Sequence, residues 1–430
     1  MSSIVLLARR LVGNATVLLL LVATVGCHNL FGVANPDEVL SSSFDTPEGA
    51  LTRAAGANSA FAGAVQAAAV ASGLLTDELT GTGFISGTTQ IDQRALPAYQ
   101  VLTPGYPYDG FSTTRIAALR AISTLHQYNP SQTALISQMF SVLGYTEEAF
   151  AENMCPGIPL AVLDANDNPT YGPIESRAGL LQTAAAHFDS ALVYAHGDTT
   201  AVPLAEVGLA RTLLAGGNWA AASQAAHAVS ETFVYAIPAT TNSPNGISTA
   251  FANQWIAVAN NEGNVGLPFI SANDSRVQVV ASGTDANGNT IYVTVPGTSI
   301  TSPLTLANGI EARLIVAEAA LPVNGGTGSS WLDTLNSLRA TIGDTALQDP
   351  GVDSARVNLL FRERAFWLFV TNHRQGDLRR LIQLYGRTVN SLFPNGLYQG
   401  GPNSYGTTTT FTPFLEQTNP NFKGCTSFSP

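Results

Sequence analysis

The sequence is poor in lysine and carries no run of positive charge. Lys423 is the one lysine among 430 residues, the other cationic side chains are arginines, and the formal net charge is −11. A P-loop needs a lysine beside its glycine-rich turn, so the tail position of Lys423 excludes that phosphate-binding motif. The acidic balance also argues against binding to nucleic acid and to an anionic membrane face.

Common catalytic signatures are missing as well. The chain contains no G-x-S-x-G, no H-E-x-x-H and no C-x-x-C, and its six histidines are scattered. These spacings belong to serine hydrolases, zinc proteases and thiol redox or metal sites. We therefore predict a protein that is not an enzyme and that needs no cofactor or metal.

The N-terminal segment has the pattern of a signal peptide. Two arginines precede an uncharged stretch over 11–26, whose apolar run is too short to span a membrane. Cys27 follows Gly26 in a sequence that resembles a bacterial lipobox. We predict a lipoprotein signal peptide over 1–26, lipid attachment at Cys27 and a linker over 27–45. The alternative is an ordinary secretory signal that happens to contain a cysteine.

Cysteine is scarce in the remaining chain, where only Cys155 and Cys425 occur. An exported protein lies in an oxidising compartment, so the two thiols could pair. They could equally be two free, buried cysteines. A disulfide framework is excluded in either case, because one bond cannot organise a chain of this length.

Helical periodicity dominates the sequence beyond the linker. Apolar residues recur at helical spacing over about 46–75, 111–240 and 308–385, whereas about 80–110, 241–305 and 386–430 are rich in turn residues. We predict a mostly α fold, with a helical core in the first three ranges and loop-rich parts in the other three. The pattern further indicates a helix over 131–145 closed by Gly144 and one continuous helix over 353–384.

One pair of predicted helices has the character of a repeat unit. Residues 203–214 and 219–229 are joined by Gly216-Gly217-Asn218, with small residues where two helices would meet. This pair resembles a tetratricopeptide unit, and weaker neighbours occur at 176–196 and 310–340. The scaffold is therefore predicted to be tetratricopeptide-like but degenerate.

A small β-hairpin interrupts the second loop-rich part. Strand-like runs over 277–281 and 291–295 flank a turn over 285–289 that contains Asn-Gly. Asn-Gly between two such runs is a strong hairpin signal.

The stretch over 362–380 resembles the signature of the SusD/RagB family. That pattern has Glu-Arg, then Glu-Gly-x-Arg, then Asp-Leu-x-Arg. The matching residues are Glu363, Arg364, Arg374, Asp377, Leu378 and Arg380. Thr371-Asn372 replaces Glu-Gly, and Gly376 stands where an aromatic residue is common. The chain is identified on these residues as a divergent member.

Shorter segments resemble the same family in the same order along the chain. They are Asp77-Glu78, the stretch from Gly144 to Leu160 with Cys155, Asp274-Ser275-Arg276-Val277, 312–319, Asn336 with Arg339, and Glu416 with Asn419-Pro420. Their order extends the resemblance over most of 46–430, which we predict to form a single SusD-like domain.

The resemblance implies a role in nutrient uptake. Such a protein would be an outer-membrane lipoprotein, facing the cell surface, that captures oligosaccharides or peptides. It would deliver them to a TonB-dependent barrel of the SusC type. A helical-repeat adaptor that scaffolds other envelope proteins is the alternative, and an exported hydrolase with an unrecognised site is a third hypothesis.

Two sets of candidate residues follow. The signature charges Glu363, Arg364, Arg374, Asp377 and Arg380 are interpreted as a buried structural ion-pair motif, because arginine-carboxylate forks fix geometry. The ligand-binding candidates are aromatic residues in loop-rich parts: Tyr99, Tyr106, Tyr108, and Trp255 near Asn260, Asn261 and Glu262. An aromatic plane with polar neighbours suits a sugar ring. The alternative is that these aromatic residues pack loops onto the scaffold.

A polar segment has the spacing of a calcium loop. Asp164, Asn166 and Asn168 alternate, and Glu175 is the twelfth residue, but Pro169 replaces the usual glycine. The alternative interpretation, a polar surface loop without metal, fits the proline better.

Overall fold

The computed structural model describes residues 41–96, 107–295, 299–413, 416 and 418–427. The chain separates into two units, Met1–Asp45 and Thr46–Pro430. The described part of the first unit contains a short 3-10 turn, η1 (Ser41–Phe44). Cys27, the predicted lipid attachment site, lies outside the described residues.

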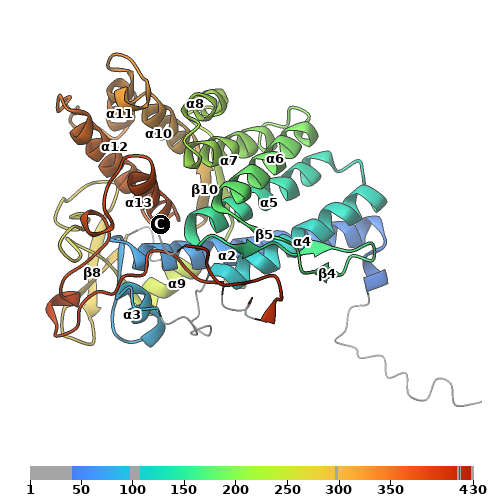
Figure 1. Ribbon diagram of the computed structural model, residues 1–430, viewed down its shortest axis with the longest axis horizontal. Helices are drawn as coiled ribbons and strands as arrows, with labels where there is room; N and C mark the ends of the chain where they lie inside the picture. Colours follow the sequence, from blue (N-terminus) through green and yellow to red (C-terminus); the bar gives the residue numbers. More distant parts are fainter. Residues whose placement is uncertain (1–40, 97–106, 296–298, 414–415, 417, 428–430) are drawn as a thin grey trace, which may run out of the picture. The chain divides into compact units, whose positions relative to one another are not determined.

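Helices form most of the second unit, which confirms the predicted mostly α fold (Figure 1). The longer ones are α2 (Pro47–Leu75), α4 (Pro107–Tyr128), α5 (Thr133–Asn153), α6 (Arg177–Ala195), α7 (Ala201–Ala215), α8 (Trp219–Ala228), α10 (Gly309–Ala319), α11 (Ser330–Thr341), α12 (Asp353–Trp367) and α13 (Arg374–Gln383). From α4 to α8 each helix packs on the next, α10 packs on α8, and α11 packs on α10. This succession is a tetratricopeptide-like scaffold.

Helix α2 is the apolar centre of the fold. The Thr46 hydroxyl accepts a hydrogen bond from the Gly49 amide at 2.9 Å, and Pro47 occupies the first turn. By length and composition alone α2 could cross a membrane, but 56% of its apolar window is buried inside the unit. It packs against α4 and α5 and is a core helix of this domain.

The predicted repeat pair is formed by α7 and α8. Gly217 between them has a φ of +76°, and the Asn218 side chain accepts a hydrogen bond from the Ala221 amide at the start of α8. The ring of Trp219 lies 6.0 Å from that of Tyr385, so it joins this pair to the segment after α13.

Gly144 does not close a helix, contrary to the prediction. Helix α5 continues to Asn153, and Gly144 lies in its middle. A Cβ atom at Gly144 would lie 2.7 Å from the ring of Phe188 on α6, and one at Gly208 on α7 would lie 2.2 Å from the same ring. Both glycines are therefore required by the close approach of this buried ring.

The strands form five antiparallel two-stranded sheets within the described residues. The pairs are β1 (Leu79–Gly81) with β7 (Ile256–Val258), β2 (Ile158–Pro159) with β5 (Ile174–Glu175), β3 (Val162–Leu163) with β4 (Pro169–Thr170), β6 (Val234–Ile237) with β10 (Leu304–Asn308), and β8 (Val279–Thr284) with β9 (Thr290–Thr294). The β8–β9 pair is the predicted hairpin. Its turn is closed by Asp285, whose Oδ1 accepts hydrogen bonds from the Asn287 and Asn289 amides at 2.8 and 2.7 Å.

Two predicted loop-rich parts contain short helices, α3 (Ser86–Asp92) and α9 (Gly246–Ala252). The Asn245 side chain caps α9 by accepting hydrogen bonds from two backbone amides. Each helix has seven residues, which is too short for a periodic pattern to stand out against its surroundings. Helix α4 also begins earlier than predicted, at Pro107.

The predicted helix over 353–384 is broken between α12 and α13. Val370 and Asn372 have φ values of +54° and +65°, which lie in the left-handed region. The Val370 amide donates to Glu78 Oε1 at 3.1 Å instead of continuing a helix. Asn372 stands where the family pattern has glycine, and asparagine tolerates left-handed backbone better than most residues.

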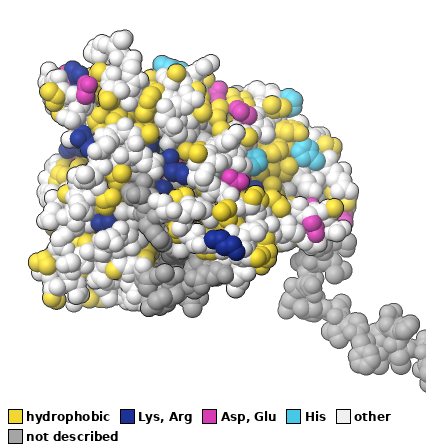
Figure 2. All heavy atoms as spheres, in the orientation of Figure 1, with side chains coloured by type: hydrophobic (Ala, Val, Ile, Leu, Met, Phe, Trp, Pro, Cys, Tyr) yellow, Lys and Arg dark blue, Asp and Glu magenta, His cyan; other side chains and the backbone are white. Residues whose placement is uncertain are grey.

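Several charged side chains of the chain are buried. Arg94, Arg364, Arg379 and Arg380 are among its largest fully buried side chains. The face shown in Figure 2 correspondingly presents mostly uncharged surface with scattered acidic and basic side chains. Buried charges of this kind need partners, since an isolated one costs several kcal/mol.

One buried ion-pair cluster lies between α12, α13 and α10. Asp377 accepts two hydrogen bonds from Arg364, both at 2.9 Å, and one from Arg380 at 2.7 Å. Arg380 also donates to both carboxylate oxygens of Glu318, at 3.1 and 3.0 Å. Burial alone would raise the pKa of Asp377, but the two guanidinium groups hold it well below its usual range.

The other two signature charges find their shortest ion pairs outside the signature. Glu363 accepts from Arg276 at 2.6 Å and from Arg339 at 3.0 Å. Arg374 donates to both oxygens of Asp77, at 2.6 and 2.9 Å. The motif therefore forms separate clusters, each of which fixes a distant segment onto α12 or α13. A Cβ at Gly376 would meet the Glu152 carboxylate at 2.2 Å, which explains why no aromatic side chain occupies that position.

Cys155 and Cys425 form a disulfide bond. The bond links the C-terminal tail to the segment that follows α5. The Cys155 amide also donates to the Phe411 carbonyl oxygen at 2.9 Å, so the tail is held at this point by a second interaction.

The calcium-loop candidate is the turn of the β3–β4 hairpin. Asp164 Oδ1 accepts hydrogen bonds from the Asn166 and Asn168 amides at 2.8 and 2.9 Å, so it closes the turn. Glu175 lies on β5 in a different sheet. Within the described ranges no three His, Cys, Asp or Glu side chains gather in a way that could hold a metal ion. The geometry is that of the polar surface loop.

Candidate binding site

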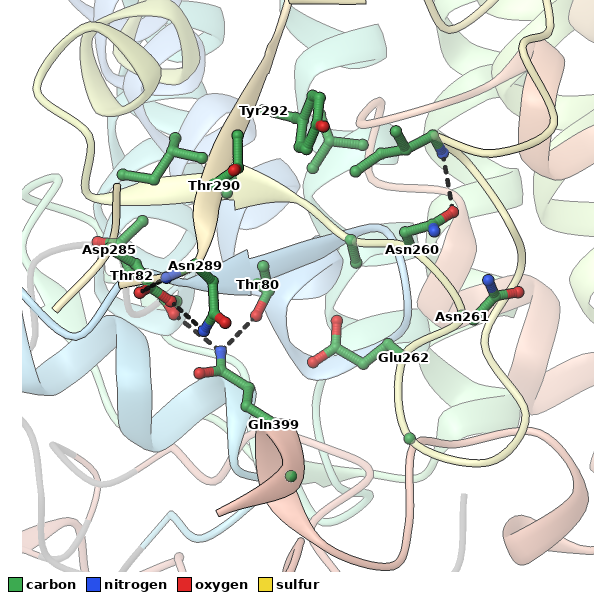
Figure 3. Close-up of a pocket in the computed structure, with 18 of the residues that line it drawn as sticks. Thr80, Thr82, Asn260, Asn261, Glu262, Asp285, Asn289, Thr290, Tyr292 and Gln399 are labelled. Carbon is green, nitrogen blue, oxygen red and sulfur yellow. Dashed lines mark hydrogen bonds between the residues drawn. The ribbon is translucent and has the colours of Figure 1, made fainter. Parts of the chain in front are cut away.

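A cavity of about 790 Å³ lies in the loop-rich half, where four segments distant in sequence meet. Its walls are β1 with Thr82, the stretch over 257–264 that begins in β7, the β8–β9 hairpin, and the tail over 396–405. Figure 3 shows the labelled side chains that surround it. Because β1 pairs with β7, these two walls are joined by backbone hydrogen bonds.

The lining is mainly polar and uncharged. Amide and hydroxyl side chains line the cavity at Thr80, Thr82, Asn260, Asn261, Asn264, Asn289, Thr290, Tyr292, Gln399 and Tyr405. Asp285 and Glu262 are the charged residues among those that line it, and no lysine, arginine or histidine belongs to this set. Ile270, Ile291 and Leu397 add apolar surface.

Internal hydrogen bonds hold two of the amides in place. Gln399 Nε2 donates to the Thr80 hydroxyl at 2.7 Å and to the Gly81 carbonyl oxygen at 3.0 Å, and so attaches the tail to β1. Asn260 Oδ1 accepts from the amides of Ile270 and Ser271 at 3.2 and 3.0 Å. Its Nδ2 group makes no hydrogen bond to the described residues, so it can donate to a bound molecule.

Two carboxyl groups lie together at the wall below β1. Glu262 Oε1 accepts from the Tyr405 hydroxyl at 2.8 Å, and Asp92 Oδ2 accepts from the Tyr398 hydroxyl and the Gly81 amide, both at 2.7 Å. The remaining oxygens, Glu262 Oε2 and Asp92 Oδ1, have no donor among the described residues. A proton shared between them would satisfy both.

The electrostatics of this pair support a shared proton. Burial raises the pKa of Asp92 to about 6. Burial, followed by the charge of Asp92 and a hydrogen bond to it, raises the pKa of Glu262 well above its usual range. The pair therefore holds one proton and one negative charge at neutral pH.

A second cavity of about 690 Å³ adjoins the first. Asn289, Gln399 and Gly400 line both, so Gln399 and the hairpin turn stand between them. The second lining comes from α3, the hairpin turn and the tail, and no charged residue is among its described members. Two adjoining cavities of this size could accept neighbouring units of an oligomer.

The aromatic ligand candidates do not line either cavity where the structure describes them. Tyr108 is 2% exposed, its ring packs 5.4 Å from that of Phe150, and its hydroxyl donates to Glu416 Oε1 at 2.5 Å. It is a core residue, which corrects the prediction. Trp255 is 37% exposed directly before β7 but belongs to neither lining. Tyr99 and Tyr106 lie outside the described residues.

The polar neighbours named with Trp255 do line the cavity, namely Asn260, Asn261 and Glu262. Six further residues line the cavity that sequence patterns did not mark as site residues: Asp285, Asn289, Thr290 and Tyr292 of the hairpin, and Gln399 and Tyr405 of the tail. The predicted hairpin was the available signal, because a polar turn on an isolated hairpin is free to cover a site. The tail offered no comparable signal.

Comparisons of sequence identify no relative: no protein-family model matches the chain, and no curated protein matches it. Solved structures do match. A SusD superfamily protein from Parabacteroides distasonis is 11% identical with a TM-score of 0.67, over 90% of this chain and all of that one. NanU from B. fragilis is 11% identical with a TM-score of 0.63, over 92% of this chain and 100% of NanU.

A third match is a SusD-like carbohydrate binding protein from Bacteroides vulgatus, 12% identical with a TM-score of 0.59 over 77% of this chain and 83% of that one. Identities this low establish the fold and leave the ligand open.

Proposed function

We propose that this chain, which has the fold of the SusD superfamily, is an outer-membrane lipoprotein that captures oligosaccharides or peptides and delivers them to a TonB-dependent, SusC-like barrel. The observation that supports this most directly is the cavity, whose walls combine amides and hydroxyls with patches of apolar surface. A sugar presents hydroxyl groups that both donate and accept hydrogen bonds, together with apolar ring faces. Amide side chains and a tyrosine ring match these groups.

The carboxyl pair does not make the site a glycosidase. Such enzymes place two carboxyl groups on either side of the scissile bond, roughly 5 to 9.5 Å apart. Asp92 and Glu262 instead face each other, and Asp92 is 1% exposed beneath β1. No sugar can lie between them. Their arrangement is that of a structural pair in the wall of a binding site, and we propose a binding protein, not an enzyme.

A binding screen with a blocked site tests the capture function. The soluble chain over 28–430 contains the whole compact unit Thr46–Pro430. Thr290 is exposed on β9 and lines the cavity, so Thr290→Trp should fill the space and lower glycan affinity at least tenfold. Val280→Trp is the matched control, because Val280 is exposed on the same hairpin but lines neither cavity. Calorimetric titration of glycans and peptides gives the affinities.

Two results would contradict the proposal. One is equal loss of affinity in both tryptophan variants. The other is failure to bind any glycan or peptide, together with no barrel that co-purifies with the full chain. The second outcome would favour the helical-repeat adaptor, which needs only the scaffold of α4 to α8 and α10.

The lipid anchor is tested separately. Cys27→Ala removes the thiol that would carry the lipid, so the variant is expected to leave the membrane fraction for the soluble fraction. Fractionation of cells followed by immunoblotting measures this shift. Retention of the variant in the membrane fraction would contradict an anchor at Cys27 and leave the binding function untouched.

A further inference from the structure

We propose that the cavity selects uncharged glycans and excludes acidic ones that carry uronate, sialate or sulfate groups. This inference rests on the proposed function and specifies its ligand class. It follows from the charges that line the site, from a buried carboxyl pair in its wall and from the placement of Arg94.

The described residues of the lining offer an anion no cationic partner. The described charged residues that line the first cavity are both acidic, Glu262 and Asp285, and none of the described residues that line the second cavity is charged. Proteins that bind anionic ligands commonly use arginine or lysine for the purpose. The cavities have amides and hydroxyls instead, which bind uncharged hydroxyl groups.

The buried pair places an uncompensated negative charge in the wall. Glu262 is 7% exposed, lines the cavity, and its Oε2 atom has no donor among the described residues. Figure 3 shows its carboxyl group on the side of Thr80 and Gln399. A single proton shared with Asp92 leaves one negative charge on the pair. A ligand carboxylate that enters the cavity is repelled by this charge.

Arg94 is a cation close to this wall, but it is directed elsewhere. Its Nε atom donates to the Thr408 carbonyl at 2.9 Å and its Nη1 atom to the Pro394 carbonyl at 2.5 Å, and the guanidinium lies over the Phe393 ring. It is 1% exposed and lines neither cavity. It therefore cannot form a salt bridge with a bound acid.

Asp285 adds negative charge on the opposite wall. It closes the hairpin turn through its side chain and lines the cavity from that side. A ligand carboxylate would thus lie between two acidic groups. Repulsion at about 6 Å with an effective dielectric constant near 20 weakens binding about 100-fold.

A glycan array with matched pairs tests this selectivity. Labelled chain over 28–430 is applied at low ionic strength to neutral oligosaccharides and to uronate-, sialate- and sulfate-bearing ones. Malto- and cellohexaose are printed beside glucuronic acid hexamers of the same linkages. We expect binding to neutral glycans only, with each acidic counterpart at least 100-fold weaker.

Charge-neutral variants then test the cause. Glu262→Gln with Asp285→Asn keeps the shape and the acceptor that closes the turn, and should raise the affinity for acidic glycans at least tenfold. Asp189→Asn with Glu231→Gln removes two exposed charges away from the cavities and should leave acidic glycans unbound. If Glu262→Gln prevents folding, Asp285→Asn alone is used as the test, and a smaller gain in affinity for acidic glycans is expected.

The outcomes separate this inference from the proposed function. Acidic glycans bound as tightly as neutral ones, with binding abolished by Thr290→Trp, would overturn the selectivity and leave glycan capture standing. An array without any bound glycan would overturn both.

Discussion

Replacing Asp377 by asparagine is expected to lower the free energy of unfolding by about 3 to 5 kcal/mol. Asp377 is 1% exposed and is the common acceptor for two buried guanidinium groups. Asparagine has nearly the same shape, but it removes the negative charge and turns an N–H₂ group toward Arg364. Arg364 would keep its charge in the interior but lose the carboxylate that accepts two of its hydrogen bonds, with Glu318 3.6 Å away. Arg380 would lose one partner and keep its hydrogen bonds to Glu318.

Urea unfolding at neutral pH measures this loss as a lower midpoint with an unchanged slope. Asp349→Asn is the control. Asp349 makes the same two-bond fork with Arg356, at 2.8 Å for both bonds, but at the surface. Water replaces the lost partner there, so the control should lose much less stability. Equal losses in the two variants would contradict the argument that burial sets the cost.

Removing a whole pair should be less harmful than removing half of it. Arg364→Met with Asp377→Leu takes out both charges, while Arg380 keeps its two hydrogen bonds to Glu318. We expect this double variant to be more stable than Asp377→Asn, because no unpaired charge remains at position 364. This comparison also stays informative if the asparagine variant accumulates poorly.

The ion pairs show which part of the fold sequence patterns could reveal. The signature charges were predicted to be structural, and Arg364 with Asp377 does pair within the signature. Arg374 and Glu363, however, find their partners about 300 and 90 residues away, in Asp77 and Arg276. Asp77 and Arg276 belong to two of the shorter segments that resemble the family, and nothing in those segments points to the signature. Pairing between them depends on the tertiary fold, which local spacing does not encode.

The same limit explains the broken helix. The apolar and charged pattern continues through 353–384, so periodicity gave no sign of an interruption. The break is set by Glu78, which accepts the amide of Val370 from a distant turn. Long helices, the repeat pair and the Asn-Gly hairpin depend on neighbouring residues, and these were predictable.

The site was predicted only in part, because an aromatic residue in a loop-rich segment can either line a ligand site or pack into the core. Tyr108 was a reasonable ligand candidate, but its ring and hydroxyl both find partners inside the fold, in Phe150 and Glu416. Burial of a large apolar ring is favourable when its hydroxyl has a hydrogen-bond partner, so Tyr108 packs in the core. The cavity is lined instead by short polar residues whose role appears only when four segments meet.

Stability is expected to fall as the pH rises from about 5 to 8, and Glu78 should account for a large share of this fall. Glu78 is 1% exposed, its Oε1 accepts from the Val370 amide, and its Oε2 has no donor among the described residues. Burial raises its pKa from 4.5 to about 8, against the opposing effects of that amide and of Arg374. The carboxyl group is therefore protonated in the folded protein at neutral pH.

The sign follows from proton binding. Between pH 4.5 and 8 the unfolded chain has lost this proton while the folded chain retains it, so raising the pH favours unfolding. The effect is about 1.4 kcal/mol per pH unit and up to about 5 kcal/mol across the range. Glu78→Gln has no proton to lose. Its stability relative to the parent should therefore increase with pH up to about 8 and then level off.

Urea unfolding of parent and variant from pH 5.5 to 8.5 at constant ionic strength measures this difference in stability. The other buried carboxyl groups contribute equally to both proteins, so their effects cancel in the difference. Asp274→Asn is the control. Burial would raise the pKa of Asp274, but hydrogen bonds from Arg276 lower it below 3.8. Any loss in the free energy of unfolding of Asp274→Asn should stay constant over the same pH range. A constant difference for Glu78→Gln as well would show that Glu78 is ionised in the folded protein, and that the Val370 amide and Arg374 outweigh its burial.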